Sequence, residues 1–94
     1  MIKHIVCFKL KDGESAEEAA KILRSMKGKV PEIIDMEVGV DFLKSERSYD
    51  LILQVTLKDE KALFSYQKDP YHCSVVKEYM HKARTASVAV DYNI

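Results

Sequence analysis

Hydrophobic and polar residues alternate in four segments of the chain, as they do in strands that bury one face. These segments are residues 2–10, 33–42, 49–57 and 87–92. The larger side chains of the first segment share one face, which we assign to the helix-covered side of a sheet: Ile2, His4, Val6, Phe8 and Leu10. In the last segment Val88, Val90 and Tyr92 share a face. The pattern predicts four β-strands.

Two stretches between these strands have the spacing of amphipathic helices. Residues 15–27 open with a capping box of Ser15 and Glu18, which is typical of a helix N-terminus. The second stretch spans residues 59–82 and is interrupted at Pro70, which cannot continue a helix but suits the first position of a new one. We therefore expect a third helix from about Pro70 to residue 82.

The predicted order is β-α-β-β-α-β, which is the ferredoxin-like arrangement of the α+β class. It predicts a single domain over residues 1–94, with an antiparallel four-stranded sheet and helices on one face only. The opposite face would include Ile5, Cys7, Ile52, Gln54 and Thr56 and is partly apolar. We expect a second copy to cover it, so that a homodimer closes a β-barrel.

Charge and composition exclude several classes of partner. The chain has 15 basic and 15 acidic residues and a net charge of +0, which argues against nucleic-acid binding and against a membrane surface. No run approaches the roughly 18–20 apolar residues of a membrane span, and no signal peptide is visible. Cys7 and Cys73 are isolated, so we read both as reduced thiols of a cytoplasmic protein.

The sequence has no motif for a metal or a bound cofactor. It lacks a glycine-rich phosphate loop, an HExxH pair and cysteine or histidine pairs at metal-binding spacing. We therefore expect neither a cofactor nor a metal.

Three segments resemble a known family. They are MIKHIVCFKLKDGE at the start, SYDLILQVT over residues 48–56 and YQKDPYHCSVVK over residues 66–77. With these segments the whole chain resembles the stress-responsive A/B barrel domain proteins of the dimeric α/β barrel superfamily. The resemblance implies a ferredoxin-like protomer and a homodimer closed through its sheets. The family includes plant stress proteins, bacterial members of unknown role and a plant polyketide cyclase that needs no cofactor.

The resemblance to the cyclase also implies a catalytic set. His72 matches its general base, Tyr66 matches an assisting tyrosine and His4 matches a histidine of its first strand. Many relatives have His-Pro where this chain has Asp69-Pro70. The pocket wall would be formed by Val6, Phe8, Ile22, Leu23, Met26 and Met80.

Each of these residues also has a purely structural interpretation. His72 lies in the first turn of a predicted helix, where the helix dipole favours the neutral imidazole that a general base requires, but it could simply cap that helix. His4 could be a hydrogen-bonded core histidine. Tyr66 could be a buried tyrosine with one hydrogen-bond partner, rather than a donor to a substrate carbonyl. His81 is expected to be a solvated residue of the last turn.

Three functions remain open at this stage. The first is a ligand-binding protein or enzyme that transforms a small carbonyl or aromatic compound by His/Tyr acid–base chemistry, which predicts a cavity of about 300 Å³ or more. The second is a non-catalytic, stress-associated structural dimer, whose interior would be filled by Phe8, Ile22, Met26, Tyr66 and Met80. The third is a cofactor-free monooxygenase.

Overall fold

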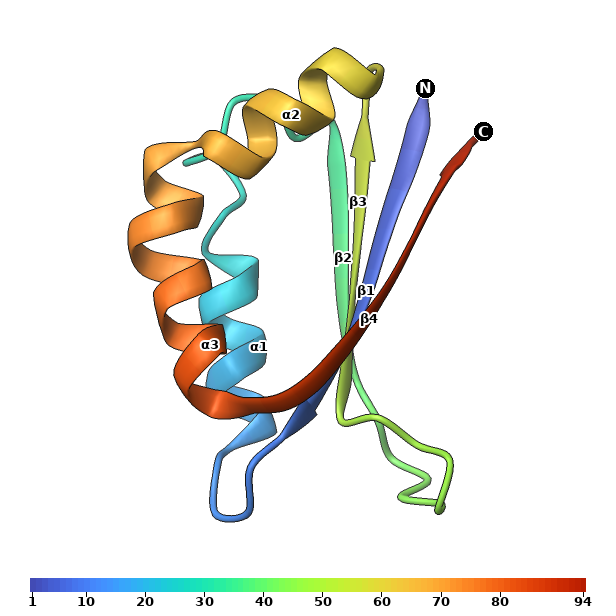
Figure 1. Cartoon of the computed structure of the whole chain (residues 1–94), viewed down its shortest axis with the longest axis vertical. Coiled ribbons are helices and arrows are strands. Elements are labelled where there is room, and N and C mark those ends of the chain that lie inside the picture. The colour runs from blue at the N-terminus through green and yellow to red at the C-terminus, as the bar shows by residue number, and fades with distance from the viewer.

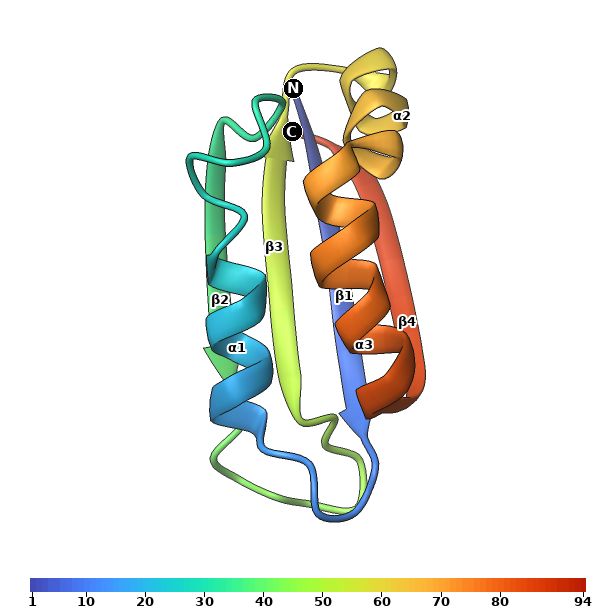
Figure 2. The ribbon, with the colours of Figure 1, turned by 90° about the vertical axis from the view of Figure 1, so that its left-hand side faces the viewer.

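Four strands form one antiparallel sheet, and all helices lie on the same side of it (Figures 1 and 2). The computed structural model describes residues 1–94. The strands are β1 (Ile2–Leu10), β2 (Asp35–Val40), β3 (Leu51–Leu57) and β4 (Arg84–Asn93), in the spatial order β2-β3-β1-β4. The helices are α1 (Ala16–Arg24), α2 (Glu60–Lys68), the π-helix η1 (His72–Lys77) and α3 (Glu78–Ala83). The predicted ferredoxin-like α+β fold is confirmed.

The first helix begins where the capping box predicts. The Ser15 hydroxyl oxygen accepts a hydrogen bond from the Glu18 backbone N–H at 3.1 Å. The helix ends at Arg24, earlier than expected, and turns follow up to Gly28, whose φ of 82° lies in the left-handed region that glycine tolerates. Leu23 on its inner side is fully buried.

The second helical region contains a feature that the periodicity did not predict. As expected, Asp59 caps α2 and the chain breaks at Asp69. The new helix then passes within two residues into a π-helix, which has hydrogen bonds between residues five apart and is rare. Because residues i and i+5 lie one above the other in a π-helix, His72 and Lys77 project from the same side.

The core lies between the sheet and the helices, and the central strands β1 and β3 supply much of it. In their register His4 is opposite Val55, and Val6 is opposite Leu53. These residues face the helices. β2 is shorter than expected, and Phe42 does not continue its inner face. The strand ends at Val40, so Phe42 lies in the following loop with 91% of its surface exposed.

The second face of the sheet has no helix over it (Figure 1). Ile5, Cys7 and Ile52 are only partly buried there. β4 adds Val88, Val90 and Tyr92, which are 51%, 60% and 44% exposed. The predicted open, partly apolar face is therefore present in the protomer.

The cysteines and the helices were also the subject of predictions. Cys7 and Cys73 are both unpaired, as predicted. None of the helices has the length and apolar character needed to cross a membrane.

We predict that Leu57→Ala lowers the free energy of unfolding by about 2–5 kcal/mol, because it removes a fully buried side chain and leaves a cavity. Urea denaturation at one fixed protein concentration measures the change. The neighbouring exposed residue supplies the control, and Lys58→Ala should change the same quantity by less than about 0.5 kcal/mol. Equal effects of the two substitutions would contradict this description of the core.

Candidate functional site

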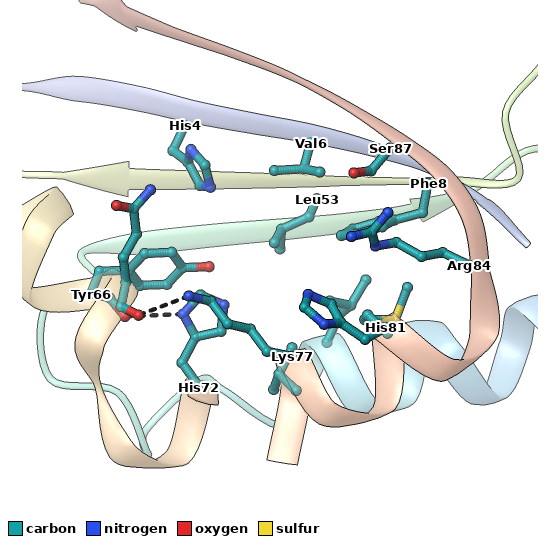
Figure 3. Close-up of a pocket in the computed structure, with 14 residues that line it drawn as sticks. His4, Val6, Phe8, Leu53, Tyr66, His72, Lys77, His81, Arg84 and Ser87 are labelled. Atoms are coloured by element: carbon teal, nitrogen blue, oxygen red, sulfur yellow. Dashed lines mark hydrogen bonds between the residues drawn. The ribbon is translucent and has the colours of Figure 1, made fainter. Parts of the chain in front are cut away.

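A cavity of about 170 Å³ lies between the sheet and the helical segment that starts at His72 (Figure 3). It has an apolar middle and polar groups towards both ends (Figure 3). Its lining residues are His4, Val6, Phe8, Leu23, Leu53, Tyr66, Gln67, His72, Val76, Lys77, Met80, His81, Arg84 and Ser87. Three strands, β1, β3 and β4, and the helices α1, α2, η1 and α3 thus all contribute to one site.

The three residues implied by the family resemblance lie next to one another at one end of this cavity. The Tyr66 ring lies between the two imidazoles (Figure 3). Its centroid is 4.3 Å from that of His72, with 38° between the planes, and 5.6 Å from that of His4, in an edge arrangement. All three side chains are buried. Sequence spacing alone could not show this convergence.

His72 is held in one tautomer by the backbone. Its Nδ1 lies 3.0 Å from the carbonyl oxygen of Tyr66. A carbonyl oxygen can only accept, so Nδ1 carries the proton and donates it, and Nε2 keeps its lone pair in the neutral ring. His72 therefore has the form that a general base needs.

The surroundings also favour the neutral form of His72. Burial lowers the pKa of its imidazole, and the positive charges of Lys77 and of a protonated His4 act in the same direction. The bond to the Tyr66 carbonyl and the charge of Asp69 oppose this shift of the pKa. Asp69 also accepts the His72 backbone N–H at 3.0 Å and so caps the start of the helix. Burial is the largest of the causes that lower the pKa of His72.

Tyr66 is a buried proton donor. None of its surface is exposed, and burial raises the pKa of its phenol well above the ordinary value. Its hydroxyl donates only to the sulfur of Met26, at 3.8 Å. Because a thioether is a weak acceptor, a ligand oxygen that reaches this hydroxyl would form a stronger hydrogen bond.

His4 has a partner that the sequence analysis did not name. Its Nδ1 is hydrogen-bonded to a carboxylate oxygen of Asp91, the residue opposite it in β4. A carboxylate accepts, so the proton of this bond lies on Nδ1 and the ring orientation is fixed. Alternation places Asp91 on the face opposite Val88, Val90 and Tyr92, but only the structure shows that this face is covered by the helices and carries His4.

The apolar wall agrees with the sequence-based expectation only in part. Val6, Phe8, Leu23 and Met80 line the cavity, but Ile22 and Met26 do not. α1 lies mainly over the β2 side of the sheet, so only Leu23 reaches the cavity beneath η1 and α3 (Figure 2). Met26 is instead fully buried against the Tyr66 hydroxyl.

The cavity is smaller than the expected 300 Å³ or more. Its volume is about 170 Å³, and Leu53 from β3 and Val76 from η1 are among the residues that line it. An engineered apolar cavity of roughly 150 Å³ binds benzene, so this volume suits a ligand of about that size.

Basic side chains also line the cavity, and sequence reasoning missed them. Lys77, His81 and Arg84 contribute to the wall, which contains no Asp or Glu. His81 is exposed, as expected, but it also forms part of the cavity mouth. No group of three or more His, Cys, Asp or Glu residues is placed to hold a metal ion.

Comparison with known proteins places this geometry in a family. The family model of the stress responsive A/B barrel domain (Dabb) matches residues 2–94. No curated protein matches the sequence significantly.

Solved structures show the same fold at low sequence identity. A dimeric ferredoxin-like protein of unknown function from Thermobifida fusca superposes with a TM-score of 0.85 at 23% identity, covering 99% of this chain and 90% of that one. A Dabb family protein from Mesorhizobium loti gives 0.75 at 20% identity, covering 99% and 95%. A hydroxynitrile lyase from Passiflora edulis gives 0.83 at 17% identity, covering 99% and 92%. The family model spans nearly the whole chain, and the chain belongs to the stress responsive A/B barrel domain family.

Proposed function

We propose that the cavity binds a small carbonyl compound of about the size of a benzene ring and that His72 moves a proton at the carbon beside the carbonyl. The observation that carries this proposal is the Tyr66–His72 pair. A protonated phenol lies against a neutral imidazole, with ring centroids 4.3 Å apart, and Nδ1 of that imidazole is already occupied. This pairs a hydrogen-bond donor with a base, as enolisation requires, in a cavity with an apolar middle.

The proposed step conserves atoms and charge. The C–H bond beside the carbonyl breaks, and its proton moves to Nε2 of His72. The electron pair of that bond forms the C=C bond of an enolate, and the negative charge moves to the carbonyl oxygen. The Tyr66 hydroxyl donates a hydrogen bond to this oxygen, as in an oxyanion hole. His72 can return the proton to the same carbon or to another position, so the step needs no oxidant.

His4 and Asp91 have a supporting role in this proposal. The carboxylate of Asp91 fixes the ring of His4, whose edge faces Tyr66. Held in this way, the His4 ring stays beside Tyr66 at the same end of the cavity. The likeness to a hydroxynitrile lyase supports the view that this fold can hold an active site. The structural-dimer hypothesis required the interior to be filled, and the open cavity favours a ligand instead.

Deuterium uptake tests the proposal without knowledge of the natural substrate. Cyclohexanone in heavy water, followed by proton NMR, should exchange its α-hydrogens faster with the wild-type protein than in buffer. His72→Gln should reduce this acceleration by at least about 100-fold, because the general base is lost. Tyr66→Phe should reduce it by a similar factor, because one oxyanion donor is lost.

Cys73→Ser is the matched control, since it alters the exposed residue next to His72 and should leave the exchange rate unchanged. Exchange that His72→Gln does not slow would contradict the assignment of the base. No acceleration for any small ketone would contradict the proposed reaction.

The proposed neutral His72 also predicts a pH dependence of stability. Its pKa in the folded protein lies below the ordinary value of 6.5, so the unfolded chain binds more protons at this residue between the two pKa values. The free energy of unfolding should therefore fall as the pH drops from 6.5 through the folded-state pKa. His72→Gln should remove this part of the fall. Urea unfolding at a series of pH values measures it, and identical slopes for the two proteins would refute the assignment.

We further propose that a second copy of the chain covers the open face of the sheet. That face carries Ile5, Val88, Val90 and Tyr92 without a helix above them. Neighbours from Thermobifida fusca, Bacteroides fragilis and Jannaschia are described as dimeric, which supports a homodimer. A face-to-face pair of sheets would bury these apolar side chains.

Light scattering should show a dimer for the wild type and a monomer for Val90→Lys, because the substitution would bury a charge in the interface. Glu17→Lys changes charge on the exposed side of α1 and should leave the dimer intact. A wild-type monomer, or a Val90→Lys dimer as stable as the wild type, would exclude this interface.

A further inference from the structure

The cavity has a local charge that the whole chain does not have. The net charge of the protein is +0, yet the lining includes Lys77, His81 and Arg84 and no acidic residue. The ion pairs within the chain join His4 to Asp91 and Lys82 to Glu78, so neither Arg84 nor Lys77 is neutralised by a neighbouring carboxylate. The only hydrogen bond from the Lys77 ammonium goes to the backbone carbonyl of Gln67, at 3.0 Å.

The local fold explains why these cations gather here. The π-helix places Lys77 on the same side as His72, whereas residues five apart on an α-helix would face in different directions. His81 follows Lys77 at a spacing of four residues, which keeps the two side chains on one helical side. Arg84 is the first residue of β4, so the chain turns back towards the sheet at the cavity mouth.

The two ends of the cavity differ in chemistry. Tyr66 and His72 lie at one end, with the Lys77 ammonium close to His72 (Figure 3). Arg84 and His81 lie at the other end beside Phe8, and Ser87 is near them (Figure 3). Val6 and Leu53 lie between the two ends. A ligand that satisfies all of these groups needs an anionic end, a short apolar link and a carbonyl.

We propose that the ligand of this site is a small oxo-carboxylic acid, whose carboxylate binds Arg84 and whose carbonyl group lies beside Tyr66 and His72. The carbonyl end rests on the function proposed above, whereas the carboxylate end rests on the basic residues alone. The planar guanidinium of Arg84 can donate two parallel hydrogen bonds to a carboxylate. The Ser87 hydroxyl and the His81 ring line the same end of the cavity and can donate to the same group.

Binding of a matched acid and amide tests the carboxylate end. Levulinate has a carboxylate and a ketone joined by a short apolar link, and levulinamide differs only in lacking the charge. Calorimetric titration of the wild-type protein should give a dissociation constant for levulinate that is roughly 10–100-fold lower than for levulinamide, because hydrogen bonds to a charged group are the stronger ones. Arg84→Gln should bring the two constants to within about threefold, and Arg84→Lys should retain part of the preference.

Lys82→Gln is the control, because it removes a positive charge from α3 at a residue that does not line the cavity. It should keep the preference for the acid. Equal binding of the acid and the amide by the wild type, no binding of levulinate, or a preference that survives Arg84→Gln would each overturn the inference. Inorganic phosphate is a third probe, and binding as tight as that of levulinate would overturn the assignment to a carboxylic acid.

The same variants test the binding of the carboxylate and the proposed reaction separately. His72→Gln should abolish deuterium uptake by levulinate but leave the ratio of acid to amide binding unchanged. A preference for the acid without any deuterium uptake would support the carboxylate end and refute the reaction. Deuterium uptake by cyclohexanone, together with equal binding of the acid and the amide, would support the reaction and refute the carboxylate end.

Discussion

Coverage of the sheet on one face only is the constraint on which the rest of this structure depends. The helices bury the inner face of β1 and β3, and the gap that remains beneath η1 and α3 is the cavity. The other face keeps Val88, Val90 and Tyr92 exposed. The topology thus separates an internal cavity from a partly apolar surface on the other side of the sheet. Strand β1 contributes to both features, because His4 lines the cavity and Ile5 lies on the open face.

The segment from Pro70 to Arg84 determines the chemistry of the internal site. Asp69 closes the first turn through the His72 backbone N–H, and the Tyr66 carbonyl fixes the His72 ring. The π-helix then moves Lys77 onto the cavity side, which a regular α-helix would not do. A change in helix type over six residues therefore influences which side chains line the cavity. π-helical turns occur frequently at functional sites, which is consistent with this placement.

Much of the fold could be predicted from the sequence, because alternation and helix capping are local signals. The four strands, the Ser15 cap and the break before Pro70 all follow from residue types within a few positions. The π-helix could not be predicted, since it depends on hydrogen-bond partners that residue spacing does not specify. The loss of Phe42 from the inner face reflects where β2 ends, and strand ends carry weak signals.

The candidate site could be predicted only in part. His4, Tyr66 and His72 were named from the family resemblance, but their convergence required the fold. Alternation placed Asp91 opposite Val88, Val90 and Tyr92, but its position beside His4 depends on the strand register, which the sequence does not specify. Arg84 could not be predicted, because it lies where a helix becomes a strand and neither periodicity applies there. The size of the cavity depends on how side chains from separate strands and helices pack, which no local pattern specifies.

The central claim is that His72 is a neutral imidazole with its proton on Nδ1 and a free lone pair on Nε2. Nitrogen NMR of histidine-labelled protein at about pH 7 distinguishes the two tautomers and the imidazolium directly. We predict a protonated Nδ1 and an unprotonated Nε2 for His72, with the assignment made by loss of its signals in His72→Gln. A proton on Nε2, or an imidazolium at that pH, would contradict the account.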